Sequence, residues 1–278
     1  MYCKENYTVL MVSMRIGTQG IPICFKCFDG IRDPEAFYDS TIINIVNEAY
    51  SIFKDKNFNI VFLADRWFNS KALLNHIDNL GCKYAIRLKS NLKISVFDKK
   101  EGHRIHKYSG DLISWKHKSL YYEDVLIYEG FSYITNIAVS RKCANDNEPW
   151  IITTNGNPNE AIRDYAHRFG GVECLFKNQK SNGFYLEKVC TASLNSFINL
   201  YSLLCFSITF LVIIGTDYCK NTKSYKKTKI TTHKNINGKK VRVKSLFNTG
   251  LTIFKIAFNS LKYIKISYKF ILYDIQLS

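Results

Sequence analysis

The chain has 278 residues, of which 46% are hydrophobic and 22% are charged. This composition excludes wholesale disorder, collagen and coiled coil, and the length suffices for one large domain or two small ones that bury a core without disulfides or metal. Thirty-nine Lys and Arg residues against 23 Asp and Glu give a net charge of +16. So basic a protein is expected to have a polyanionic partner, either nucleic acid or an anionic membrane surface.

The positive charge is concentrated toward the C-terminus. Residues 217–278 hold 14 Lys and Arg against Asp217 and Asp274, a net +12, whereas residues 1–216 carry a net +4. We interpret 217–278 as a basic tail that binds a polyanion as a solvated polyelectrolyte, with a frayed C-terminus as the alternative.

The first 88 residues are predicted to alternate strands and helices. Two runs rich in β-branched and aromatic residues flank a turn that contains Gly, which predicts a hairpin. A short apolar run farther on predicts a buried parallel strand, and Asp65 stands at its carboxyl end. The expected elements are strands at 7–16 and 21–28, a helix at 37–53, a strand at 59–64, a helix at 69–80 and a strand at 83–88. This alternation predicts α/β structure.

Beyond residue 88 the pattern changes. Residues 89–155 contain no convincing helix and are interpreted as mainly β structure. A helix is predicted to begin at Pro158, with Asn157 as its cap, and to run to about residue 180. The short strands are expected at 92–97, 111–115, 119–128, 133–140 and 150–154. We expect 7–88 and 158–215 to form one layered α/β structure to which this β-rich segment attaches.

Residues 197–215 form an apolar run of a length that spans a membrane. Four polar residues between Asn199 and Thr209 interrupt the run. We favour a core helix buried against a sheet. Membrane association through this run and the basic tail is the less favoured alternative.

The nine cysteines are scattered, and the N-terminus has no signal peptide pattern, so reduced thiols in a cytoplasm are expected. Cys24 and Cys27 form a lone C-x2-C motif. Zinc needs a second pair of ligands, for which His103 and His106 are the best candidates, and we expect no such site.

Two carboxylates are candidates for chemistry. Asp65 lies where α/β sheets place their ligands, although a surface Asp is the simpler interpretation of this residue alone. On a helix, Lys177 and Lys180 lie about 40° and about 20° around the axis from Glu173, one on each side. This stripe is either a solvated face or a site for a metal ion with a phosphate backbone across it. The apolar flank expected to pack on the protein body is Ile162, Phe169, Val172 and Phe176.

Tyr165, Arg168, Glu173 and Lys180 follow a pattern of Tyr, two residues, Arg, then Glu, six residues and Lys. This pattern resembles the signature of DDE transposases of the insertion-sequence-four type. The signature has three residues between Arg and Glu, and this chain has one more, at Gly170-Gly171. A one-residue π-bulge at the two glycines would restore the alignment of the helix face.

A second stretch carries the same resemblance. Asp65, a helix, and then a strand that ends near Arg87 and Lys89 are similar to the family's region around its second catalytic Asp. The order also agrees, because Asp65 on a strand is followed by a β-rich insertion and then by Glu173 on a helix. The resemblance covers residues 7–215.

The resemblance implies an α/β fold, a ribonuclease H-like mixed sheet with flanking helices, interrupted by a mainly β insertion. The expected domains are 1–88 as the first part of the catalytic domain, 89–155 as the insertion, 156–216 as the second part with the Glu-bearing helix, and 217–278 as the basic tail. In this family the first catalytic Asp lies on the first strand of the sheet. The hairpin at 7–28 is similar to the second and third strands, so we expect the first strand before Met1 and an N-terminally truncated transposase.

The family's chemistry implies two Mg²⁺ (or Mn²⁺) ions that cleave DNA strands and transfer them. Asp65 and Glu173 would be the catalytic and metal-binding carboxylates, facing each other across a divalent ion. The residues expected to contact DNA are Tyr165, Arg168, Lys177, Lys180, Arg87 and Lys89.

The implied partners are double-stranded DNA, as element ends and target, and a second copy on that DNA, in a nucleoid-associated cytoplasmic protein without membrane contact. With one carboxylate missing, binding is expected to survive better than catalysis. The alternative is a non-catalytic DNA-binding remnant that interferes with an intact transposase.

Overall fold

The computed structural model describes two compact units. The described residues are 2–3, 7–30, 32–113, 118–141, 148–180, 184–189, 191–220, 230, 232–236, 239–242 and 244–259. One unit, here called the hairpin unit, comprises Met1–Ala36, Glu48–Ile52 and Phe169–Ser278. The other, here called the sheet unit, comprises Phe37–Asn47 and Phe53–Arg168.

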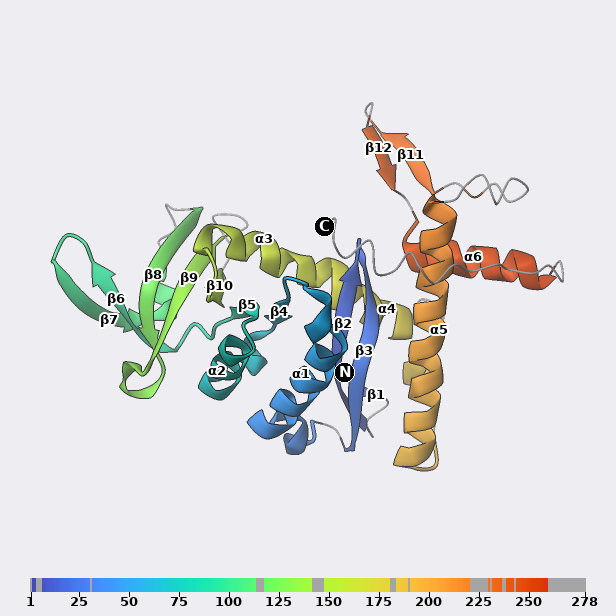
Figure 1. The fold of residues 1–278 in the computed structure, drawn as a ribbon, viewed down its shortest axis with the longest axis horizontal. Helices are drawn as coiled ribbons and strands as arrows, with labels where there is room; N and C mark the ends of the chain where they lie inside the picture. The colour runs from blue at the N-terminus through green and yellow to red at the C-terminus, as the bar shows by residue number, and fades with distance from the viewer. Residues whose placement is uncertain are drawn as a thin grey trace. The chain divides into compact units, whose positions relative to one another are not determined.

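The sheet unit is built on one seven-stranded mixed sheet (Figure 1). Its strands, in order across the sheet, are β4 (Val61–Ala64), β5 (Lys83–Arg87), β10 (Trp150–Thr154), β9 (Tyr133–Ser140), β8 (Ser119–Ile127), β6 (Lys93–Asp98) and β7 (His103–Tyr108). β4 and β5 are parallel, and all other neighbours are antiparallel. The structure thus confirms the predicted α/β class with a mixed sheet and flanking helices.

Helices α2 (Lys71–Asn79) and α3 (Pro158–Arg168) belong to the sheet unit, and α1 (Asp39–Phe53) contributes residues to both units. α2 begins at Ser70, whose Oγ accepts a hydrogen bond from the Leu73 backbone N–H (3.2 Å) and so satisfies one donor of the first turn. α3 packs on β4, β5, β9 and β10. Its buried residues enter a small apolar cluster of Ala85, Ala138, Ile152, Ala161 and Tyr165.

The hairpin unit contains the predicted hairpin, β2 (Tyr7–Ile16) with β3 (Gln19–Asp29), and a short strand β1 (Tyr2–Cys3) on β2. Helix α4 (Cys174–Lys180) also contacts β3. The unit is completed by α5 (Leu194–Lys220), α6 (Leu246–Asn259) and a small sheet of β11 (His233–Ile236) and β12 (Lys239–Arg242). The hairpin and α5 enclose the main core, which includes Val9, Ile21, Tyr201, Ile208 and Phe247.

One face of α5 packs on β3 and on α6. Its crossing with α6 is close because Gly215 of α5 meets Gly250 of α6. A Cβ on Gly215 would lie 1.9 Å from the Leu246 carbonyl oxygen. The opposite side of α5 exposes Leu203 and Phe206. Among the described residues, α5 is a helix that is long and apolar enough to cross a membrane, and half of its most apolar stretch is buried within the protein.

A π-turn, Phe169–Glu173, joins α3 to α4. It lies at the glycine pair where the sequence predicted a one-residue bulge. The turn has room for one residue more than an α-helical turn, so it absorbs the surplus residue between Arg168 and Glu173.

Beyond the π-turn, the buried face of the helix differs from the expected one. The buried residues of α4 are Leu175, Asn178 and Gln179, and the Gln179 Nε2 donates to the Tyr201 hydroxyl (3.0 Å). Of the expected apolar flank, Ile162 on α3 is half-buried and packs on the apolar cluster, as predicted. Phe169 is exposed, and Val172 and Phe176 are only half-buried. The prediction was wrong for these three residues because it used the phase of an uninterrupted α-helix.

The strand arrangement also corrects one expectation. The hairpin and β4 lie in different sheets, whereas the β-rich segment joins the sheet of β4 and β5 through β10. The hairpin therefore shares no sheet with β4 and β5, whereas the described part of residues 89–155 is mainly β structure, as predicted. Strand patterns reveal which residues are extended and not which strands pair.

The remaining differences are local. The strand expected at 111–115 is wrong over its described part, because Ser109–Leu112 forms a 3-10 turn; residues 114 and 115 lie outside the described residues. The strand β7 was not predicted. At the C-terminal end, the boundary expected at 216 and 217 falls inside α5, and α6 forms part of the basic tail.

Candidate active site and nucleic-acid interface

Asp65 follows β4 directly and lies at the carboxyl ends of the two parallel strands of the sheet unit. It caps a 3-10 turn, Arg66–Phe68. Its Oδ1 accepts a hydrogen bond from the Arg66 backbone N–H (2.7 Å), and its carbonyl accepts one from the Phe68 N–H (3.0 Å). A third of the Asp65 side chain remains exposed. The carboxylate is therefore held in one orientation and is still accessible.

Arg168 joins Asp65 from the end of α3. Its Nη2 lies 3.5 Å from Asp65 Oδ2, and the Arg168 side chain is 18% exposed. The Arg168 guanidinium carbon also lies 6.0 Å from the centroid of the Tyr165 ring, within cation–π range. Arg168 of the sequence signature thus lies between Tyr165, another signature residue, and the Asp65 carboxylate, and all three belong to the sheet unit.

Tyr165 itself is buried, with 1% of its surface exposed, and its ring meets Trp150 edge-on with centroids 5.3 Å apart. The expected direct contact between Tyr165 and DNA does not fit this position, because the whole side chain is covered. The structure instead gives Tyr165 a packing role beneath Arg168.

Glu148 links two further arginines beside this carboxylate. The Arg66 Nη2 lies 2.9 Å and the Arg87 Nη2 lies 3.2 Å from Glu148 Oε2. The hydrogen bond from Arg66 and the charges of both arginines lower the pKa of the Glu148 carboxyl below its ordinary value. The hydrogen bond to Glu148 likewise raises the pKa of Arg66. Sequence patterns gave no signal for Glu148, because it lies in a loop before β10.

Lys89 lies just beyond β5, and its Nζ is 5.4 Å from the centroid of the Trp67 ring. Sequence analysis missed Trp67 and Arg66, although both immediately follow Asp65. An arginine and a tryptophan directly after a candidate carboxylate were the available signal. Four cationic side chains (Arg66, Arg87, Lys89 and Arg168) thus lie around Asp65 and Glu148.

Glu173, Lys177 and Lys180 belong to the hairpin unit. Glu173 ends the π-turn and is exposed; Lys177 is exposed, and Lys180 is half-buried. Asp65 belongs to the sheet unit. That its carboxylate and that of Glu173 face each other stays a prediction.

Both carboxylates suit a divalent ion chemically, because Mg²⁺ and Mn²⁺ prefer carboxylate oxygens. Within the part of the chain that the structure describes, no group of three His, Cys, Asp or Glu residues has the geometry of a metal site. Cys24 and Cys27 both lie on β3 and are half-buried.

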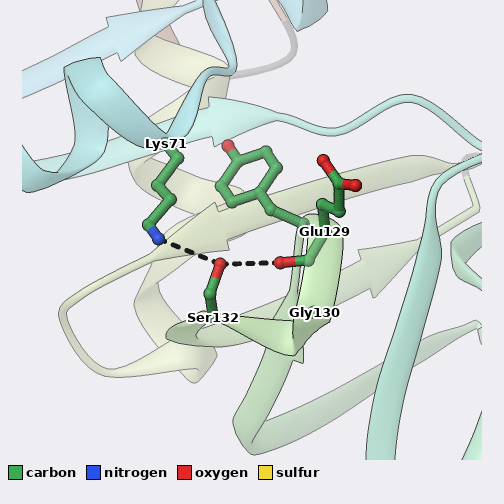
Figure 2. A pocket seen from close by; sticks show the side chains of 5 residues that line it. Lys71, Glu129, Gly130 and Ser132 are labelled. Carbon is green, nitrogen blue, oxygen red and sulfur yellow. Dashed lines mark hydrogen bonds between the residues drawn. The ribbon is translucent and has the colours of Figure 1, made fainter.

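A separate open depression of about 560 Å³ lies in the sheet unit. Figure 2 shows Lys71 reaching Ser132, with Nζ and Oγ 2.9 Å apart, and Ser132 donating to the Glu129 carbonyl oxygen (2.8 Å). Tyr128 and Gly130 complete its lining. It shares no lining residue with the Asp65 cluster, and its lining carries one lysine and one glutamate, so it offers little net charge to attract phosphate.

A partly exposed carboxylate at the carboxyl ends of parallel strands, with arginine and lysine side chains near it, suits a protein that binds a metal ion and phosphates. The family comparison agrees with this class. The family model described as the transposase DDE domain matches residues 8–210. The chain therefore belongs to the transposase DDE domain family, whose function is DNA transposition. Comparison with curated proteins gives no significant match.

Proposed function

We propose that this chain is a transposase of the insertion-sequence-four type, with Asp65 and Glu173 as metal-binding catalytic carboxylates. The observation that carries the proposal is the convergence of Arg168 on Asp65, at 3.5 Å. Arg168 belongs to the signature that includes Glu173, and Asp65 belongs to the other matched stretch. The two stretches are distant in the sequence, and Arg168 of one lies beside Asp65 of the other.

The proposed cofactor is Mg²⁺ or Mn²⁺. When bound, such ions activate the attacking hydroxyl and stabilise the leaving oxygen of a phosphodiester. The protein's own part is to hold Asp65 through the Arg66 N–H and to orient it through Arg168. Arg87, Lys89, Lys177 and Lys180 would contact DNA phosphates, which fix the position of the DNA without reading its sequence.

We further propose that the chain alone binds DNA and does not cleave it. The resemblance implies three carboxylates, and two of them, Asp65 and Glu173, match residues of this sequence. Loss of one anionic ligand weakens two-metal catalysis more than it weakens phosphate contacts, because catalysis requires both ions to be positioned accurately. The alternative function, a non-catalytic remnant that interferes with an intact transposase, needs DNA binding alone.

Cleavage is tested by incubating the purified chain with labelled duplexes that cover the DNA on either side of its gene, in Mg²⁺ or Mn²⁺. We expect no nicked product. Nicking that disappears in Asp65→Ala and in Glu173→Ala would overturn the inactivity proposal and would support both carboxylate assignments. Assembly of two copies on DNA and association with the nucleoid stay predictions.

Phosphate binding by the sheet unit is tested with Arg87→Ala/Lys89→Ala. The matched control is Lys99→Ala/Lys100→Ala, which removes the same charge from the exposed turn between β6 and β7. The first variant should bind a mixed-sequence 30-base-pair duplex more weakly, and its slope of log K against log salt should fall by about one per lost phosphate contact. Equal behaviour of the two variants would contradict the assignment.

A further inference from the structure

We propose that Trp67 and Lys89 form a stacking site for an unpaired nucleobase beside Asp65. This inference rests on the proposed function, because it names the form of DNA that the same site receives. The ligand is a nucleotide of a single-stranded or frayed DNA segment, with its base on the indole and its phosphates on the neighbouring cations.

Trp67 is unusually exposed for its type, at 68% of its surface. The indole is two residues beyond Asp65, in the 3-10 turn that Asp65 caps. Single exposed apolar residues are common on soluble proteins and need no explanation by themselves. Two neighbours distinguish Trp67 from such residues. The Lys89 ammonium lies over its ring, and the candidate catalytic carboxylate of Asp65 caps the same turn.

The turn that carries Trp67 is anchored on both sides. Asn69 follows it, and its Nδ2 donates to Thr153 Oγ1 on the buried β10 (2.9 Å), while the Tyr128 hydroxyl donates to Asn69 Oδ1. Asp65 fixes the start of the turn through the Arg66 N–H. A ring on an anchored turn loses little conformational freedom on binding, which favours affinity.

The charges around the ring suit a nucleotide more than an apolar partner. Lys89 Nζ lies 5.4 Å from the ring centroid, and Arg66 and Arg87 share the single carboxylate of Glu148. The three cations exceed the charge of the one Glu148 carboxylate, so positive charge remains to bind phosphates. Combined aromatic faces and cations are the features by which proteins bind single strands without sequence preference.

The ring selects unpaired bases for a steric reason. In a duplex, each base face is covered by its neighbours, so an indole can stack only on a base at an end, an overhang or an opened step. Such a base occurs where a strand is cut, and a stacking site near Asp65 would hold it there. Aromatic stacking of one base typically changes affinity by roughly 5- to 100-fold.

The test uses fluorescence anisotropy with three probes of one sequence: a blunt 30-base-pair duplex, the same duplex with a five-nucleotide overhang, and that overhang made abasic. The wild-type chain should bind the overhang probe at least about fivefold more tightly than the other two. Trp67→Ala should lose this preference while keeping its affinity for the blunt duplex, and Trp67→Phe should keep most of it. The control Phe97→Ala removes another exposed aromatic ring, on β6, and should change nothing.

Retention of the preference in Trp67→Ala, or equal binding of the abasic overhang, would overturn the stacking site while leaving the proposed function intact. Failure of the wild-type chain to bind any probe would overturn both. Tryptophan fluorescence gives a second readout: the overhang should quench the wild-type emission saturably, and this quench should be absent in Trp67→Phe. Circular dichroism of each variant checks its folding.

Discussion

At the scale of single residues, the signature residues Tyr165 and Arg168 occupy different environments. The sequence motif identified both as site residues but could not say which would be exposed. Their roles depend on the phase of α3 against the sheet, which puts the Tyr165 ring in the core and the Arg168 guanidinium beside Asp65. This geometry suits Arg168 to orienting Asp65, with Tyr165 packed beneath it, and the expected contact of Arg168 with DNA stays a prediction.

This division predicts the effect of truncating Tyr165. Tyr165→Ala should lower the free energy of unfolding by about 3–5 kcal/mol, because it removes a fully buried ring from the α3 cluster. Tyr165→Phe should cost much less. Urea denaturation followed by circular dichroism measures both, with Tyr121→Ala, an exposed ring on β8, as the control. Equal losses in Tyr165→Ala and Tyr121→Ala would contradict the buried packing role.

Glu148 is predicted to restrain DNA binding, because it occupies Arg66 and Arg87. At pH 7, Glu148→Gln should raise affinity for a blunt duplex by about 2- to 5-fold, the range expected for an exposed ion pair. Glu123→Gln, an equal charge change elsewhere on the sheet unit, is the control. An unchanged or weakened affinity in Glu148→Gln, or an equal gain in Glu123→Gln, would show that Glu148 does not compete with DNA for the two arginines.

The pH dependence of this restraint follows from the lowered pKa of Glu148. A carboxylate whose folded pKa is depressed stabilises the folded state at pH values above its ordinary pKa, here 4.5, and that contribution is lost as the pH falls through the lower folded value. Glu148 should therefore stay ionised and paired with the arginines from neutral pH down to about 4.5. The difference in duplex affinity between wild type and Glu148→Gln should persist over this range and fade only below it.

At the scale of elements, the π-turn determines which face of α4 packs within the hairpin unit. The tight point is between the backbones of Gly20 on β3 and Gly171 in the turn: a Cβ on Gly20 would lie 2.7 Å from the Gly171 carbonyl oxygen. Gly20 therefore lets the hairpin approach the π-turn, because a side chain at this position would collide with the Gly171 carbonyl group.

We accordingly predict that Gly20→Ala lowers the free energy of unfolding by about 1–3 kcal/mol, the usual cost of overpacking against groups that cannot move aside. Gly170→Ala is the matched control, because its new Cβ would meet nothing nearer than 3.6 Å. Thermal and urea unfolding of the two variants measure the difference. Similar stability of the two would mean that the hairpin and the π-turn do not pack as described.

The successes and failures of sequence-based prediction at this scale have physical causes. Local sequence signals located β2 and α3, because a run of β-branched and aromatic residues favours a strand and Pro158 after Asn157 favours a helix start. They missed β7, an edge strand of mainly polar residues. They misread the stretch near Leu112, where an apolar pattern serves a 3-10 turn. Even the correctly found β2 and β4 were given the wrong relation, since strand pairing depends on distant partners.

At the scale of the whole molecule, charge is expected to dominate DNA binding. The net charge of +16 is mostly carried by residues 217–278, and part of that segment is folded as α6. Affinity for a mixed-sequence duplex should fall by orders of magnitude between 50 mM and 200 mM salt if about six or more phosphates are contacted. Anisotropy titrations across this range measure the slope. Salt-independent or absent binding would contradict the assignment of DNA as partner.

The central proposal is that Asp65 and Glu173 bind the same divalent ion. The most direct test is Mn²⁺ binding measured by electron paramagnetic resonance in the presence of duplex DNA, for wild type, Asp65→Ala, Glu173→Ala and the double variant. If the two carboxylates bind one ion, each single variant should lose nearly as much bound Mn²⁺ as the double variant, while Asp98→Ala, at the end of β6 in the sheet unit, loses none. Wild-type Mn²⁺ binding in Glu173→Ala, or losses that simply add, would contradict the shared site.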